Sequence, residues 1–336
     1  MNTRADFLAA LAVAATLPAV PGFREAPRPP PALRRGDRVG LIAPASPPTG
    51  DDIDRAVANV ESLGLVAVLG AYVRAQDGYL AGTDEQRAAD FNAMARNPAI
   101  RAIVAIRGGY GTMRILTRLD YDAIERDPKV LMGFSDVTAI LNAVATRSRV
   151  ITFHGPLGAH GSSWDGRARE AIEALLFNPE PPGRLALAGA QPIVAGRARG
   201  RLAGGNLSLV AALVGTPFAL PLGDALFFFE ETEEAPYHID RMLTQLDLAG
   251  DLRAVRGTLA GQCTKCVAPG PSPHAAEVVA ERLRAAGRPA VAGAPIGHIP
   301  RQWVLPIGSL AELDATGGTL TLLEAAVAPA SGGRHR

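Results

Sequence analysis

Residues 130–141 read VLMGFSDVTAIL and combine a strand pattern, a turn and a helix pattern. The apolar run 130–132 is typical of a short buried strand, and the apolar spacing of residues 137–146 is typical of a helix that packs on a sheet. Ser135 lies in the turn between them. A serine there sits at the carboxyl end of a strand and the positive end of a helix, where a nucleophile or an anion is stabilised.

A helix cap is the alternative interpretation of this turn. Serine and aspartate are preferred at helix N-termini, so Ser135 or Asp136 would then only begin the helix. The segment taken alone favours the cap. A catalytic interpretation needs partners elsewhere in the chain.

Strand and helix patterns alternate on both sides of this turn. We expect strands near 39–43, 65–69, 101–105 and 150–152, and helices near 51–63 and 84–97. This order predicts an α/β fold with a doubly wound parallel sheet, in which ligands bind at the carboxyl ends of the strands. Residues 35–178 are assigned to this N-terminal domain, which carries the candidate nucleophile.

The second half of the chain predicts a smaller α/β domain with a barrel-like sheet. The Gly-, Ala- and Arg-rich segment 179–204 is expected to cross between the domains, and 205–326 to form the C-terminal domain. The last residues, 327–336, are expected to be disordered.

The N-terminus has the pattern of an export signal. Arg4 precedes the apolar run 7–20, which has the length of a signal-peptide core and is too short to span a bilayer comfortably. We therefore expect residues 1–22 to be a signal peptide and 23–34 to be a Pro-rich linker. The mature protein would then be periplasmic, without stable membrane insertion. It would be cytoplasmic if the segment is not a functional signal.

The composition favours an enzyme or binding protein for small molecules or peptides. The net charge is +1 and aromatic residues make up 5% of the chain, so the sequence has neither the strong positive charge nor the aromatic side chains typical of nucleic-acid binding.

Cys263 and Cys266 form a lone C-x-x-C pair, whereas a zinc site needs two further ligands at suitable spacing. We interpret the two cysteines as structural residues that can form a disulfide bond if the protein is exported.

Three further segments hold candidates for chemistry. The glycine-rich stretch 107–111 follows a predicted strand and forms either a tight turn or a source of backbone N–H groups for an oxyanion, together with the amide of Asp136. Glu230 and Glu231 end an apolar strand, and only one of them can face a cleft because strand side chains alternate. His298 lies in a short turn and can complete a serine–acid–histidine set.

The remaining candidates have plausible structural roles. His154 closes a predicted strand and is expected near the same cleft. The loop of Gly204, Gly205 and Asn206 would bind a substrate carboxylate or simply make a turn, and Arg241 would serve that carboxylate or be a surface charge.

Together these segments resemble the LD-carboxypeptidase family, serine peptidase family S66, which also includes microcin C self-immunity proteins. The matching segments are, in family order, GDRVGLIAPASP, IRGGYG, MGFSDVTAI, FHGP, GGNLSLV, FFEETEEAPYHIDRMLTQL and IGHIP. They cover roughly residues 35–325. The resemblance implies a flavodoxin-like or class I amidotransferase-like N-terminal domain, a smaller C-terminal domain, an active site in the cleft between them, and a homodimer.

The resemblance also implies roles for individual residues. Ser135 would be the nucleophile, His298 the general base and Glu230 the acid that orients it, with no metal or other cofactor. The oxyanion hole would consist of the backbone N–H groups of Gly109 and Asp136. The implied substrate contacts are Arg107, Tyr110, Gly204, Gly205, Asn206 and Arg241.

The reaction that the resemblance implies is hydrolysis of the L,D-amide bond that releases the terminal D-alanine from murein tetrapeptides. The alternative within the family is a microcin-immunity type hydrolase of peptidyl or aminoacyl nucleotides. Residues 270–297 hold no aromatic residue to stack an adenine, which favours the peptidase. An alternative of another class is a non-catalytic muropeptide-binding protein, against which the presence of all three triad residues argues.

Overall fold

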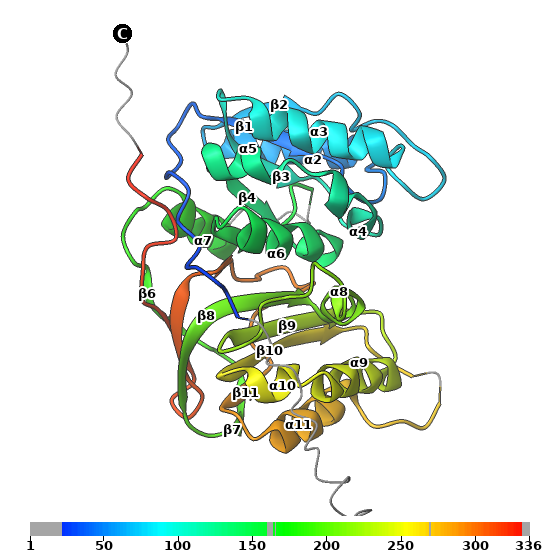
Figure 1. The fold of residues 1–336 in the computed structure, drawn as a ribbon, viewed down its shortest axis with the longest axis vertical. Coiled ribbons are helices and arrows are strands. Elements are labelled where there is room, and N and C mark those ends of the chain that lie inside the picture. Colours follow the sequence, from blue (N-terminus) through cyan, green and yellow to red (C-terminus); the bar gives the residue numbers. More distant parts are fainter. Residues whose placement is uncertain (1–21, 160–163, 165, 269, 331–336) are drawn as a thin grey trace, which may run out of the picture.

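A computed structural model describes residues 22–159, 164, 166–268 and 270–330 of the chain. The elements gather around two β-sheets that lie one above the other along the long axis of the molecule (Figure 1). No helix in the described ranges is both long and apolar enough to cross a membrane. Of the predicted signal peptide at 1–22, only Gly22 lies within these ranges.

The upper sheet has six strands in the order β12-β5-β4-β3-β1-β2. Its strands are β1 (Arg38–Ile42), β2 (Val66–Leu69), β3 (Ile100–Ala105), β4 (Val130–Gly133), β5 (Thr152–His154) and β12 (Leu305–Ile307). The first five are parallel, and their order 2-1-3-4-5 along the chain is that of a flavodoxin-like sheet. The predicted doubly wound N-terminal domain is therefore confirmed.

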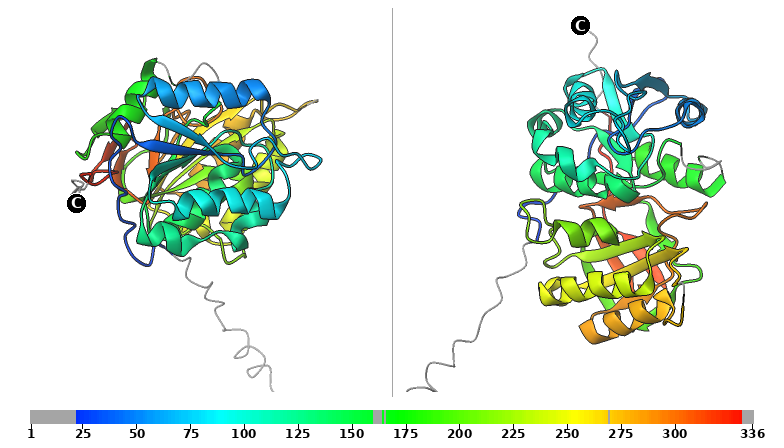
Figure 2. Two further views of the ribbon diagram at one scale, coloured as in Figure 1. Left: turned by 90° about the horizontal axis from the view of Figure 1, so that it is seen from above. Right: turned by 90° about the vertical axis from the view of Figure 1, so that its right-hand side faces the viewer.

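Helices cover both faces of this sheet. They are α2 (Gly50–Ser62), α3 (Asp84–Arg96), α4 (Thr112–Ile115), α5 (Tyr121–Arg126), α6 (Thr138–Arg147) and α7 (Gly166–Leu176), with short 3₁₀ turns η1 (Leu116–Arg118) and η2 (Ser135–Val137). Figure 2 shows α2 on one face and α3 on the other. Thr49 and Thr83 begin these two helices with reciprocal capping boxes, which satisfy the first free backbone N–H groups.

The lower sheet has eight strands in the order β6-β14-β13-β8-β9-β10-β11-β7. Its strands are β6 (Gly183–Ala186), β7 (Gln191–Val194), β8 (Arg197–Asn206), β9 (Leu226–Thr232), β10 (Gly257–Thr264), β11 (Ala290–Ala292), β13 (Leu310–Asp314) and β14 (Thr319–Leu322). The helices of this unit are α8 (Leu207–Leu213), α9 (Pro236–Leu248), α10 (Asp251–Ala254) and α11 (Ala275–Ala286). Strands β8 to β11 run parallel, so the predicted second α/β unit is present.

Three stretches differ from the sequence-based expectation. The expected crossover 179–204 holds β6, β7 and most of β8, and β8 pairs with β13 through one half and β9 through the other. The expected linker packs on the body, where Leu33 is buried and Pro31 pairs with Ala328. Val327, in the expected disordered tail, is buried as well, while 331–336 lie outside the described residues.

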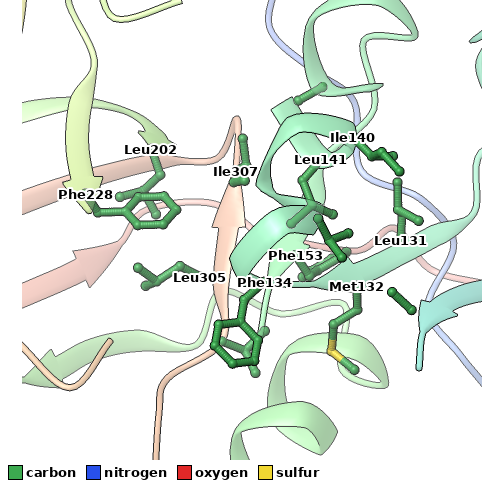
Figure 3. Close-up of a cluster of buried hydrophobic side chains, with 14 of the residues drawn as sticks. Leu131, Met132, Phe134, Ile140, Leu141, Phe153, Leu202, Phe228, Leu305 and Ile307 are labelled. Atoms are coloured by element: carbon green, nitrogen blue, oxygen red, sulfur yellow. The ribbon is translucent and has the colours of Figure 1, made fainter. Parts of the chain in front are cut away.

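One apolar core joins the two units. Strand β12 comes from the C-terminal half of the chain but pairs antiparallel with β5 at the edge of the upper sheet. Around it, Phe134 from the end of β4 gathers with Leu202 of β8 and Phe228 of β9 (Figure 3). The carboxyl end of β4 is therefore held against the lower sheet.

Candidate active site

Ser135 occupies the turn between β4 and η2. Its φ of 61° lies in the left-handed region, which is uncommon for a residue other than glycine and marks a strained turn. Neither Ser135 nor Asp136 caps a helix, because η2 and α6 both begin without a side-chain capping bond. The capping interpretation of this turn is therefore wrong, and the serine stands at a strand-to-helix elbow.

His298 and Glu230 form a hydrogen-bonded pair. The His298 ring nitrogen Nδ1 lies 2.7 Å from Glu230 Oε2, and the glutamate side chain has no exposed surface. Glu230 comes near the end of β9, and His298 comes from the loop between β11 and β12. A buried carboxylate bound to Nδ1 leaves Nε2 of the imidazole free to act as a base.

Glu231 takes a different role, as strand alternation predicted. Its Oε1 accepts hydrogen bonds from Asn206 Nδ2 and the Thr232 amide, both at 2.9 Å. Its Oε2 accepts from the Ser208 amide at 2.8 Å and from Ser208 Oγ at 2.7 Å. The carboxylate is thus fully occupied in joining the ends of β8 and β9 to the start of α8.

A cleft of about 490 Å³ contains both Ser135 and His298. Its lining comes from the upper unit (Arg107, Gly108, Gly109, Phe134, Ser135 and Leu157) and from the lower one (Thr232, Glu233, Thr264, Lys265 and His298). A larger cavity, of about 590 Å³, lies between α7 and the loop 293–304 and contains none of the three predicted triad residues. The cleft between the units is therefore the candidate active site.

The glycine-rich loop lies beside the serine. A side-chain carbon on Gly108 would stand only 3.1 Å from Ser135 Cβ, so glycine lets the loop approach the serine closely without displacing it. Gly109 has a φ of 108°, and the next amide, of Tyr110, donates to Ser46 Oγ at 3.2 Å. Within the described ranges no hydrogen bond engages the Gly109 amide, which leaves it available to a ligand.

Asp136 ties this loop to the serine turn. Its Oδ2 accepts from the Thr112 amide at 2.8 Å, and its carbonyl oxygen accepts from Thr112 Oγ1 at 2.5 Å. Burial raises the pKa of the Asp136 carboxyl, against the hydrogen bonds from Thr112 that lower it. The two backbone amides predicted as oxyanion donors, of Gly109 and Asp136, thus sit on segments that are fixed to each other.

We expect Thr112→Val to lower kcat about 5- to 10-fold with little change in KM, because one hydrogen bond of about 1 kcal/mol that fixes the donors is lost. Thr152→Val is the matched control, since Thr152 Oγ1 is also buried and bonds the Leu141 carbonyl at 3.0 Å. Steady-state kinetics of the two variants checks the prediction. Equal losses in both would contradict a role for Thr112 in the oxyanion hole.

The predicted substrate contacts divide into two groups. Arg107 lines the cleft, and Tyr110 is exposed and contacts the ring of Tyr79. Neither Tyr110 nor the other four predicted contacts line the cleft. Gly204 and Gly205 let β8 pack closely, since a side-chain carbon on Gly205 would overlap Thr138.

Asn206 and Arg241 also have contacts away from the cleft. Asn206 caps α8 and donates to Glu231. Arg241 is exposed on α9 over the ring of Tyr237. Neither placement brings the side chain to Ser135.

Two charged residues on the cleft were missed from the sequence. Lys265 and Glu233 form an ion pair of 3.0 Å, and both lie just beyond the carboxyl ends of parallel strands, where ligand sites of such sheets gather. Lys265 lies between Cys263 and Cys266, both of which are free thiols. The position of Lys265 directly after strand β10, rather than its residue type, is the sequence signal that could have placed it on the cleft.

His154 does not line the cleft but is buried behind it. Its ring meets Phe134 and Phe228 edge-on, with centroid distances of 5.9 and 5.2 Å. Burial lowers the pKa of the His154 imidazole to about 4, and the nearby charge of Glu230 only partly opposes this. The ring is therefore neutral at physiological pH.

The buried ring predicts a loss of stability in acid. Between pH 6.5 and about 4 the unfolded chain binds a proton that the folded His154 does not, so the free energy of unfolding falls as the pH is lowered. The expected loss is about 3 kcal/mol relative to a variant without this ring. Urea unfolding of the wild type and His154→Phe across this range measures it. Parallel pH dependences for both proteins would contradict the buried neutral ring.

A strained serine elbow that shares a cleft with an acid-paired histidine is the arrangement of a serine hydrolase, and this is the class of protein that the fold and the site define. Among the described residues no group of three or more histidine, cysteine or acidic side chains could hold a metal ion.

The LD-carboxypeptidase N-terminal domain matches residues 39–155, and the LD-carboxypeptidase C-terminal domain matches residues 199–313. The chain is 37% identical to the probable murein peptide carboxypeptidase of Bacillus subtilis, over 89% of this chain and 95% of that protein. It is 31% identical to the murein tetrapeptide carboxypeptidase of Pseudomonas aeruginosa, over 82% and 93%. A solved structure of the microcin C7 self-immunity protein MccF shares the fold, with a TM-score of 0.83 at 23% identity, over 90% of this chain and all of that one.

The chain belongs to the LD-carboxypeptidase family and is a serine carboxypeptidase. The predicted family and reaction class are thereby confirmed.

Proposed function

We propose that the protein releases the terminal D-alanine of murein tetrapeptides by hydrolysing the L,D-amide bond, with Ser135, His298 and Glu230 as the catalytic triad. The observation that carries the proposal is the 2.7 Å bond between His298 and the buried Glu230, in a cleft that His298 shares with Ser135. The names of the Bacillus and Pseudomonas relatives support the substrate.

The first half of the reaction acylates the serine. A serine hydroxyl is un-ionised at neutral pH, so His298 Nε2 takes its proton as Oγ attacks the carbonyl carbon of the L,D-amide. Glu230 stabilises the imidazolium that forms. The amides of Gly109 and Asp136 bind the developing oxyanion. His298 then gives the proton to the leaving nitrogen, and D-alanine departs as the free amino acid.

The second half returns the enzyme to its starting state. Water enters where the amine left, and His298 removes one of its protons as the oxygen attacks the acyl carbon. The same two amides hold the second oxyanion. Its collapse breaks the ester bond, and the proton on His298 passes to Ser135 Oγ. The products are the shortened peptide and the regenerated serine.

A carboxypeptidase must also hold the free carboxylate of its substrate. We propose Arg107 for this contact, because it lines the cleft and its only ion pair among the described residues is a long one, 3.9 Å to Asp52. Lys265 supplies a second positive charge on the opposite wall, shared with Glu233. Tyr110, Gly204, Gly205, Asn206 and Arg241 are weaker proposals, since they act on the substrate only if the cleft rearranges.

The test uses the full chain with murein tetrapeptide, and mass spectrometry follows the loss of the terminal D-alanine. We expect release by the wild type and not by Ser135→Ala. Turnover of an aminoacyl nucleotide in place of the tetrapeptide would support the microcin-immunity alternative, for which MccF shares the fold. Phe134 is the one phenylalanine, tyrosine or tryptophan among the described residues that line the cleft, and it is buried, which disfavours adenine stacking.

We further propose export and dimerisation. Residues 1–22 have the signal-peptide pattern, so the mature protein would act on periplasmic muropeptide. Fractionation of cells that produce the full chain, with sequencing of the mature N-terminus, tests the first point. The homodimer that the family resemblance implies is tested by light scattering of the purified protein.

A further inference from the structure

The second carboxylate oxygen of Glu230 has no hydrogen-bond partner among the described residues. Oε2 receives the bond from His298, while Oε1 is buried and unpaired. A buried charged oxygen without a donor is costly, so such atoms are almost always satisfied. Within the described residues, the triad alone leaves this requirement unmet.

The ring nitrogens of His154 are also buried without a hydrogen-bond partner among the described residues. Its ring is completely buried, and neither Nδ1 nor Nε2 has a partner in the described part of the chain. A neutral imidazole carries one N–H donor and one acceptor nitrogen. Two unsatisfied groups of opposite hydrogen-bonding type are thus buried in the same region.

The surrounding strands place these two groups on one side of β9. Phe228 and Glu230 are two residues apart on that strand, so their side chains share a face. The His154 ring packs edge-on against Phe228, and Phe134 contacts both His154 and His298, the latter with ring centroids 4.7 Å apart. The charged or titratable groups that act on His154 electrostatically are Glu230 and His298.

We propose that His154 is a positioning residue of the catalytic triad, which donates a ring N–H to one buried water that in turn donates to Glu230 Oε1. The inference rests on the proposed roles of Ser135, His298 and Glu230. His154 would act through Glu230 and touch no reacting atom. With both carboxylate oxygens bonded, the carboxylate is held in the plane that its hydrogen bond to His298 requires.

Removing the ring N–H group of His154 should therefore lower kcat and shift the pH profile in a predictable direction. His154→Phe suits the aromatic surroundings but has no N–H group. We expect kcat to fall on the order of 10- to 100-fold, the range for loss of a hydrogen bond to a charged group, with KM little changed. A carboxylate without its second bond is more basic, so the Glu230–His298 pair takes up a proton more readily. The acid side of the kcat/KM pH profile should move to higher pH.

Two further variants separate positioning from packing. His154→Gln restores an amide donor and should recover most of the lost rate and the wild-type pH profile. Phe227→Leu disturbs the same buried strand on its other face and should change neither the profile nor the rate per folded molecule. In a Glu230→Gln background, His154→Phe should have no further effect on rate, because its role depends on the carboxylate.

These experiments distinguish a failure of the proposed role of His154 from a failure of the proposed triad itself. An unchanged rate and pH profile in His154→Phe, or a Gln variant as slow as the Phe variant, would overturn the positioning role even if Glu230→Gln showed its expected large loss of rate. A Glu230→Gln enzyme with wild-type activity would instead overturn the triad itself. Folded fractions, measured by near-ultraviolet circular dichroism, normalise every rate.

Discussion

Replacing Ser135 by alanine is expected to lower kcat for D-alanine release by a factor on the order of 10⁶. The hydroxyl is the attacking group, and the base and the oxyanion amides have no other nucleophile to activate in its place. What remains is the contribution of substrate binding and the oxyanion hole. Stopped or continuous assays of the purified variant, sensitive to one turnover per enzyme over many hours, measure the loss.

Ser148→Ala is the matched control for Ser135→Ala. Ser148 is also buried in the upper unit, and its Oγ donates to the Tyr121 carbonyl at 2.9 Å. We expect this variant to lose stability but to keep its rate per folded molecule. If Ser135→Ala retained a rate close to that of Ser148→Ala, the serine mechanism would be rejected.

The upper sheet could be predicted from the sequence because parallel, buried strands are continuous apolar runs separated by helical periodicity. The partner of β12 could not. A three-residue apolar strand carries no information about which sheet it joins, and the pairing of Leu305–Ile307 with β5 depends on the packing of both units. The strands in 179–204 were missed because glycine, alanine and arginine hide the alternation.

The triad candidates were predictable because chemistry restricts residue type and topology restricts position. Alternation along β9 predicted that only one of Glu230 and Glu231 faces the cleft, and the family resemblance selected Glu230. The structure shows the two carboxylates with different partners. The Gly204–Gly205 pair was interpreted either as part of a carboxylate-binding loop or as a turn. In the structure these glycines allow close packing of β8, which no local sequence pattern distinguishes from those two roles. Lys265 and Glu233 are exposed charges, and such residues show no periodicity that marks a cleft.

Glu230→Gln is expected to lower kcat by about 10⁴, as loss of the orienting acid does in other triads. The amide keeps the size of the side chain, but it cannot stabilise the imidazolium, and its N–H group favours the wrong tautomer of His298. Because Glu230 is completely buried, no solvent molecule replaces the lost charge. Rates per folded molecule, with tetrapeptide as substrate, measure the effect.

Glu231→Gln makes the comparison decisive because the two residues are neighbours with the same side chain. The Glu231 carboxylate accepts four hydrogen bonds, and a glutamine has only one oxygen to accept them. We expect a loss of stability of about 1–3 kcal/mol, with kcat within about 10-fold of the wild type. The reverse pattern, with the large kinetic loss at Glu231, would assign the triad acid to the other face of β9. Glu230→Gln therefore measures how β9 supports the reaction, and Glu231→Gln measures how the same strand supports the fold.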